Sequence, residues 1–235
     1  MKDFKEFLHG FTLAEVLVTL GIIGVVSALT LPTLIQNYQK TTYVTQLHKV
    51  YNDVSQAAVR YKTDNNLVSL TESRLSSDAE LTRFVTKYFK ITKNCNGSYI
   101  GCFADTYRAI EGNSTTDLST SYCKVTVVLA SGAALCFDTG VREDKPADKD
   151  TNNDGKIDEN DKIINNGAHE GTAMGIELDI NGVKGPNIAG RDLFRMDVAP
   201  DGTVYDAEGA SATTLTQSGP FGIGRIIDAG WDMTY

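Results

Sequence analysis

The most constraining feature of this sequence is an apolar run near its start, residues 11–31, in which Glu15 is the only charged residue. An α-helix of about 20 residues is about 30 Å long, which matches the hydrocarbon thickness of a bilayer. A carboxylate inside such a segment costs roughly 3 kcal/mol of insertion free energy, so acids of this kind usually have a function. The run therefore predicts a membrane-spanning helix in which Glu15 has a functional role.

Two simpler interpretations of the run stay open. A secretory signal peptide is compatible with Val26-Ser27-Ala28, which fits a small-x-small cut site, although the run continues beyond it and such cores carry no Glu. A plain membrane anchor is also compatible, because Glu15 lies about one turn inside the membrane edge and could reach the headgroups. Neither interpretation gives the carboxylate a purpose.

The stretch GFTLAEVLVTLGIIGVV, residues 10–26, resembles the N-terminus of type IV pilins and of the pseudopilins of type II secretion. The resemblance implies that residues 1–10 are a leader, that a prepilin peptidase cuts between Gly10 and Phe11, and that the new N-terminal Phe11 is methylated. Pro32 stands where many family members carry a proline that kinks or locally melts the helix. The leader departs from the family, because its lysines are balanced by acids where a net positive charge is usual.

The resemblance also implies a role for Glu15 in subunit assembly. Cleavage would leave a free amine on Phe11, and an isolated charge in an apolar setting is costly unless it is paired. Glu15 of a neighbouring subunit can pair with that amine, and a buried ion pair of this kind specifies register more than it adds stability. Glu15 and Pro32 are therefore the expected assembly residues.

The function that follows is a structural subunit of a type IV pilus or type II secretion-like filament. The expected partners are other pilin or pseudopilin subunits, the prepilin peptidase, a membrane assembly platform and membrane lipid. The expected location is the bacterial cytoplasmic membrane, crossed once with the head outside the cytoplasm, and then an extracytoplasmic filament. The alternative is a membrane-anchored calcium-binding or adhesive module that does not polymerise. The residues do not distinguish a major pilin, a minor pilin, a pseudopilin and a DNA-uptake pilin.

Composition and histidine placement exclude other classes. The net charge is −8, and the chain has no basic cluster, which disfavours nucleic acid as a partner. His9 is lost with the leader, and neither His48 nor His169 has a Ser or Cys in a nucleophile context. We therefore expect no enzyme and no catalytic residue.

Residues 32–62 continue the helix with a different pattern. Apolar residues recur at three- and four-residue spacing while polar residues occupy the other faces, which predicts an amphipathic half-helix. We expect this stripe to pack on the protein's own sheet rather than in a free coiled coil; it comprises Val44, Leu47, Tyr51, Val54, Ala58 and Tyr61. The two halves predict one long helix over residues 11–62.

Residues 63–235 are expected to form an α/β head, so that the whole fold is α+β with a long N-terminal helix packed on a C-terminal antiparallel sheet. A short helix is predicted over residues 77–89, capped by Ser77 or Asp78. A hairpin is predicted around Ser131-Gly132. Further strands are predicted over residues 175–180, 193–198, 203–205 and 225–228.

All four cysteines follow the apolar run, and none forms a Cys-x-x-Cys pair. Disulfides on the far side of a membrane explain them better than zinc or redox chemistry does. Four cysteines allow three connectivities, which sequence does not distinguish, and free buried thiols stay possible. We favour pairing of neighbours, Cys95 with Cys102 and Cys123 with Cys136.

The stretch DKDTNNDGKIDENDKI predicts a calcium loop over residues 150–161. Alternating oxygen donors around Gly155 follow the EF-hand loop pattern, and hard oxygen ligands favour Ca²⁺. Asp161 replaces the usual closing Glu, and a solvated acidic insertion is the alternative. The expected ligands are Asp150, Asn152, Asp154, Lys156 through its carbonyl, Asp158 and Asp161.

A second metal site is a weaker possibility. Asp179, Asn181 and Asp192 could supply its oxygen donors. Asn181-Gly182 is, however, more typical of a turn.

Overall fold

The computed structural model describes residues 11–73, 75, 77–112, 115–118, 123–138, 172–206 and 221–235. Its helices are α1 (Leu13–Asp64), the 3-10 helix η1 (Leu70–Glu72), α2 (Asp78–Tyr88) and α3 (Gly224–Asp228). Its strands are β1 (Ile91–Asn94), β2 (Thr106–Arg108), β3 (Thr115–Asp117), β4 (Val125–Leu129), β5 (Ala134–Asp138), β6 (Met174–Asp179), β7 (Leu193–Val198), β8 (Val204–Asp206) and β9 (Phe221–Gly222).

The chain forms two compact units, Met1–Thr42 and Tyr43–Tyr235. In the first unit, α1 is uninterrupted at Pro32. The helix therefore continues through this position without local melting, although the proline still removes one backbone donor from it. No described residue before Tyr43 is buried.

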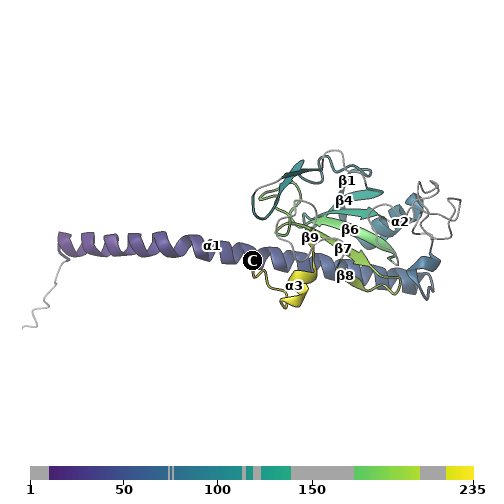
Figure 1. The fold of residues 1–235 in the computed structure, drawn as a ribbon, viewed down its shortest axis with the longest axis horizontal. Helices are drawn as coiled ribbons and strands as arrows, with labels where there is room; N and C mark the ends of the chain where they lie inside the picture. The colour runs from purple at the N-terminus through teal and green to yellow at the C-terminus, as the bar shows by residue number, and fades with distance from the viewer. Residues whose placement is uncertain are drawn as a thin grey trace, which may run out of the picture. The chain divides into compact units, whose positions relative to one another are not determined.

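The second unit, which we call the head, is built on one main sheet with strand order β1-β4-β5-β6-β7-β8 (Figure 1). All neighbours in this order are antiparallel, as expected. At the edge beyond β7, β8 pairs with the last part of the strand and β9 pairs with its first part in a parallel direction. The parallel pair was not expected.

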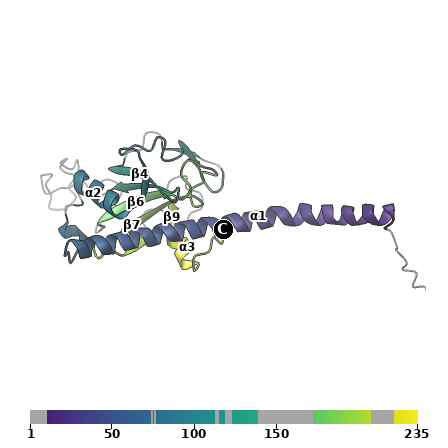
Figure 2. The same cartoon turned by 180° about the vertical axis from the view of Figure 1, so that it is seen from behind.

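One face of the sheet packs against helices (Figures 1 and 2). The stripe predicted on α1 is confirmed, because five of its six residues are buried and Tyr51 is half-buried. Alternate sheet residues such as Leu135 and Phe137 join the same core as α1 and α2. The residues that alternate with them, Ala134 and Cys136, belong to a second core on the opposite face.

That second core contains the segment from Cys95 to Leu118, which carries the two-stranded sheet β2-β3. Tyr99, Phe103 and Tyr107 are its large buried side chains. The head is therefore a sheet covered on both faces, by helices on one and by this irregular segment on the other. The strands β1, β2 and β3 were not predicted, because three or four residues are too few to show an alternating pattern.

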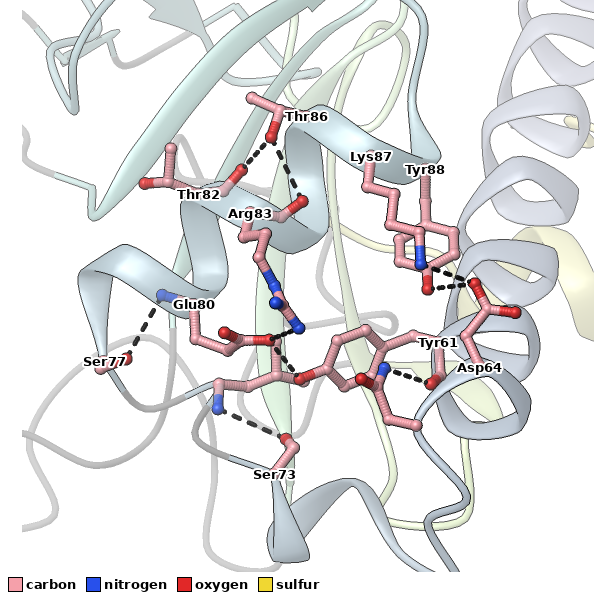
Figure 3. Close-up of polar contacts among 12 residues, drawn as sticks. Tyr61, Asp64, Ser73, Ser77, Glu80, Thr82, Arg83, Thr86, Lys87 and Tyr88 are labelled. Atoms are coloured by element: carbon pink, nitrogen blue, oxygen red, sulfur yellow. Dashed lines mark hydrogen bonds and ion pairs between the residues drawn. The ribbon is translucent and has the colours of Figure 1, made fainter.

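The predicted helix over residues 77–89 is confirmed as α2. Ser77 is its N-cap and accepts a hydrogen bond from the Glu80 backbone N–H at 3.3 Å (Figure 3). Tyr61 of α1 donates to Glu80 Oε1 at 2.9 Å. Lys87 and Tyr88 bond Asp64 Oδ2 at 2.8 Å each, so α2 is tied to the end of α1 by polar contacts at both of its ends.

The predicted hairpin is confirmed as β4 and β5, and the strands predicted at residues 175–180, 193–198 and 203–205 correspond to β6, β7 and β8. The strand predicted over residues 225–228 is wrong, because this segment is α3. The adjacent isoleucines favour a strand locally, but the Gly224 N–H donates to Asp206 Oδ1 at 2.8 Å and Ile226 is buried in the core. These tertiary contacts outweigh the local preference.

Candidate functional site

The first turn of α1 holds Glu15 in a reciprocal pair with Thr12. The Thr12 backbone N–H and hydroxyl each donate to Glu15 Oε2 at 2.8 Å, and the Glu15 N–H donates to Thr12 Oγ1 at 3.3 Å. This is a capping box, in which two side chains satisfy backbone donors at a helix start. The Thr-x-x-Glu spacing that marks it is visible in the sequence, although no role was predicted for Thr12.

The capping box uses one carboxylate oxygen only. Among the described residues, no donor bonds Glu15 Oε1. Phe11 immediately precedes the box and is 90% exposed. Gly10 lies outside the described residues. The geometry therefore places one free carboxylate oxygen about one turn from Phe11.

The rest of the run is suited to an apolar environment. Thr19 donates its hydroxyl to Glu15 O at 2.8 Å, and Thr30 donates to Val26 O at 2.9 Å, so these polar side chains are satisfied inside the helix. The apolar side chains are exposed, from 42% for Val16 upwards. Within the described residues, α1 is the one helix long and apolar enough to cross a membrane.

Two disulfides are present in the head. Cys95 bonds Cys102 and Cys123 bonds Cys136, which confirms the favoured pairing of neighbours. The first closes the loop before β2, and the second joins the segment just before β4 to β5. Both lie in the second core and fix its segment to the sheet.

The second metal site considered in the sequence is a buried hydrogen-bonded cluster. Tyr107 donates to Asp179 Oδ2 at 2.5 Å, and the Asn181 N–H donates to Asp179 Oδ1 at 2.9 Å. Asp192 accepts the N–H groups of Asn187 and Ile188 at 2.6 Å each. Both carboxylates are therefore bonded by protein donors, and the sequence analysis missed Tyr107 because its partner is 72 residues away.

The electrostatics of this cluster follow from burial. Asp179 and Asp192 are fully buried, which raises the pKa of both carboxyls. For Asp179, burial and then the nearby charge of Asp192 raise the pKa to about 8. Burial therefore favours the neutral form of Asp179 relative to an exposed aspartate.

Among the residues that the structure describes, no group of three or more His, Cys, Asp or Glu side chains is arranged to hold a metal ion. The predicted calcium ligands at residues 150–161 lie outside the described residues. His169 also lies outside them. His48 is on α1, where its ring lies against Trp231 with a centroid distance of 4.1 Å.

Comparison with known proteins gives one match. Residues 9–31 match the family described as the prokaryotic N-terminal methylation motif. No curated protein and no solved structure matched the chain. The matched residues contain the capping box and the whole apolar run. The chain therefore carries the prokaryotic N-terminal methylation motif, the prepilin-type signal of type IV pilins and pseudopilins, on the membrane-compatible start of a 52-residue helix.

Proposed function

We propose that the chain is a structural, non-enzymatic subunit of a type IV pilus or type II secretion-like filament, assembled through residues 11–31 after residues 1–10 are removed. One observation carries this proposal. Glu15 is the only charge in the exposed apolar run, residues 11–31, which lies within the match to the methylation motif, and it keeps one carboxylate oxygen unbonded by described residues. A charge in this position is explained by a partner that arrives with assembly.

The assembly step pairs Glu15 with the amine of Phe11 from a neighbouring copy. The intrachain capping box occupies Glu15 Oε2, so Oε1 accepts the incoming ammonium without breaking the start of the helix. The pair neutralises two charges that would each be costly in an apolar bundle. Chains are therefore stabilised only at the offset that brings amine and carboxylate together.

The proposed partners are a prepilin peptidase, other pilin or pseudopilin subunits, a membrane assembly platform and membrane lipid. The proposed location is the cytoplasmic membrane with the head outside the cytoplasm, followed by the filament. The disulfides support this orientation, because they persist in oxidising compartments.

The first experiment determines the mature N-terminus. Intact mass and N-terminal sequencing of protein from the producing cell should give a chain that begins at N-methyl-Phe11. A start at Met1 or Leu29 would contradict the proposal, because no amine would then lie one turn from Glu15.

The second experiment tests the role of the carboxylate. Glu15→Gln keeps the shape of the side chain and removes its charge, so it should leave membrane insertion intact and abolish recovery of sheared filaments. Thr19→Val is the matched control, because the Thr19 hydroxyl bonds only its own helix backbone. Wild-type amounts of filament from the Glu15 variant would refute the pairing.

We also propose that residues 150–161 bind Ca²⁺, supported by the loop pattern of alternating oxygen donors. Asp150→Ala with Asp154→Ala should remove the increase in melting temperature that calcium gives the wild-type protein. Asn153→Ala, at a position that the pattern does not use as a ligand, is the control. Equal melting of the wild-type protein in calcium and in chelator would refute the metal site.

A further inference from the structure

A groove of about 310 Å³ lies in the head between α1 and the β1 edge of the sheet. Lys49, Asp53, Gln56 and Arg60 of α1 line one wall at four- and three-residue spacing, so they share one side of the helix. Lys90, which precedes β1, and the turn after β4 line the other wall. The buried residues Phe89 and Leu129 contribute apolar surface between the walls.

The groove is cationic in an acidic protein. Three of its side chains are cations and Asp53 is its only acid, whereas the whole chain has a net charge of −8. Other head cations such as Lys87 and Arg195 form salt bridges. With described residues, the side chains of Lys49, Arg60 and Lys90 form neither a salt bridge nor a hydrogen bond, although Arg60 lies near enough to Asp64 to lower its pKa.

The opposite edge of the sheet is acidic. It consists of β8, β9 and the following α3. Asp206 ends β8, and Asp228 ends α3 with Asp232 four residues further; the last two are exposed. The pKa of Asp206 is raised, first by burial and also by the charges of Asp228 and Asp197. The nearby Arg225 has its guanidinium over the Tyr235 ring at 4.6 Å.

We propose that the cationic groove of one copy receives the acidic β8/α3 edge of a second copy, which joins heads in a head-to-tail row. The inference rests on the proposed filament function. Charge complementarity favours this edge as the partner surface. The cations of the groove attract carboxylates, and they would reduce the repulsion between the carboxylates of the β8/α3 edge. The two surfaces differ and lie on opposite edges, so the contact is heterologous, and heterologous contacts that do not close build helical filaments.

The test reverses charge on each surface in the full-length protein of the producing cell. Lys49→Glu with Lys90→Glu should lower the yield of sheared filaments at least about tenfold, because like charges then face each other across the contact. Asp228→Lys with Asp232→Lys should do the same. Combining all four substitutions should restore most of the yield, which also shows that the variants fold.

The matched control is Arg108→Glu with Lys184→Glu. Both side chains are exposed, have no salt bridge with described residues, and lie in neither surface. This control makes the same change in net charge and should assemble as the wild type does. Carbodiimide treatment of wild-type filaments should join Lys49 or Lys90 to Asp228 or Asp232 between copies, giving a ladder of multimers and the linked peptides by mass spectrometry.

The outcomes separate the two proposals. If the wild type assembles and both double reversals assemble equally well, the groove contact is refuted while the filament function stands. If the four-fold variant assembles no better than either double variant, the two surfaces do not meet each other. If the wild type never forms filaments, the proposed function fails, and the groove contact that rests on it fails too.

Discussion

The two parts of α1 differ in how their apolar residues are distributed around the helix, and this difference follows from the surroundings that each part requires. Over residues 11–31, apolar residues occur all round the helix, and none of the described residues before Tyr43 is buried. After Tyr43, apolar residues form a stripe that is buried against the sheet, and polar residues occupy the other faces. A helix that is apolar all round suits lipid or a bundle of like helices, whereas a striped helix suits a surface with a single apolar partner.

Substitution of two leucines of α1, one from each part of the helix, tests this difference and should give the largest change in stability. Leu47 is fully buried, whereas Leu20 is 60% exposed. Leu47→Ala should lower the free energy of unfolding of the head by about 2–5 kcal/mol, because it leaves a cavity. Leu20→Ala should leave head unfolding unchanged. Urea unfolding followed by Trp231 fluorescence measures both changes. Equal losses of unfolding free energy for the two variants would contradict the difference between the two parts of α1.

Removing a disulfide from the head should have the next largest effect. Cys123 and Cys136 are 13 residues apart, and loss of a crosslink of this length costs about 3 kcal/mol in the chain-entropy account. Replacing both with Ala should lower the midpoint of urea unfolding accordingly. Replacing Cys95 and Cys102, which are 7 residues apart, should lower it slightly less. The reverse order would show that packing of the second core, rather than loop length, decides the loss.

The buried carboxyl of Asp179 should make the head sensitive to pH. Its pKa is about 8 in the folded chain against 3.8 as the reference value, so the folded state holds the proton more tightly than the unfolded chain. The stabilisation is complete below about pH 4 and is lost as pH rises to about 8. We expect a loss of about 2 kcal/mol, because real interiors moderate burial effects.

Asp179→Asn isolates this contribution. Unfolding free energies of the variant and the wild type, measured from pH 4 to 9, should differ in slope, and the variant should be flatter. Asp105→Asn, in the same segment as Tyr107 but exposed, is the control and should keep the wild-type slope. Parallel curves for the wild type and the Asp179 variant would contradict the raised pKa.

The smallest expected effect compares two helix caps. Ser77 caps α2 inside the head, and Thr12 caps α1 far outside the head in sequence. Ser77→Ala should lower head stability by about 1 kcal/mol, the usual value of an N-cap. Thr12→Ala should leave head stability unchanged in the same urea measurement. A loss for Thr12 equal to that for Ser77 would show that the head depends on the start of α1.

Features with a local pattern were predictable from the sequence. The apolar run, the stripe on α1 and the Ser77 cap each appear as spacing within one or two turns of a helix. The hairpin around Ser131-Gly132 was predictable because alternation flanks a turn signal. Glu15 was singled out as the expected assembly residue because a single charge stands out in an apolar run.

What the sequence determined by itself is therefore a long helix with two kinds of surface, a short capped helix, most of the central strands and a processing motif at the start. The tertiary structure decided the rest. It made residues 225–228 a helix through Asp206, joined Tyr107 to Asp179 and selected one disulfide pairing. The physical reason is that periodicity and caps act between residues within a few positions, whereas burial, pairing and charge complementarity act between segments that only folding brings together.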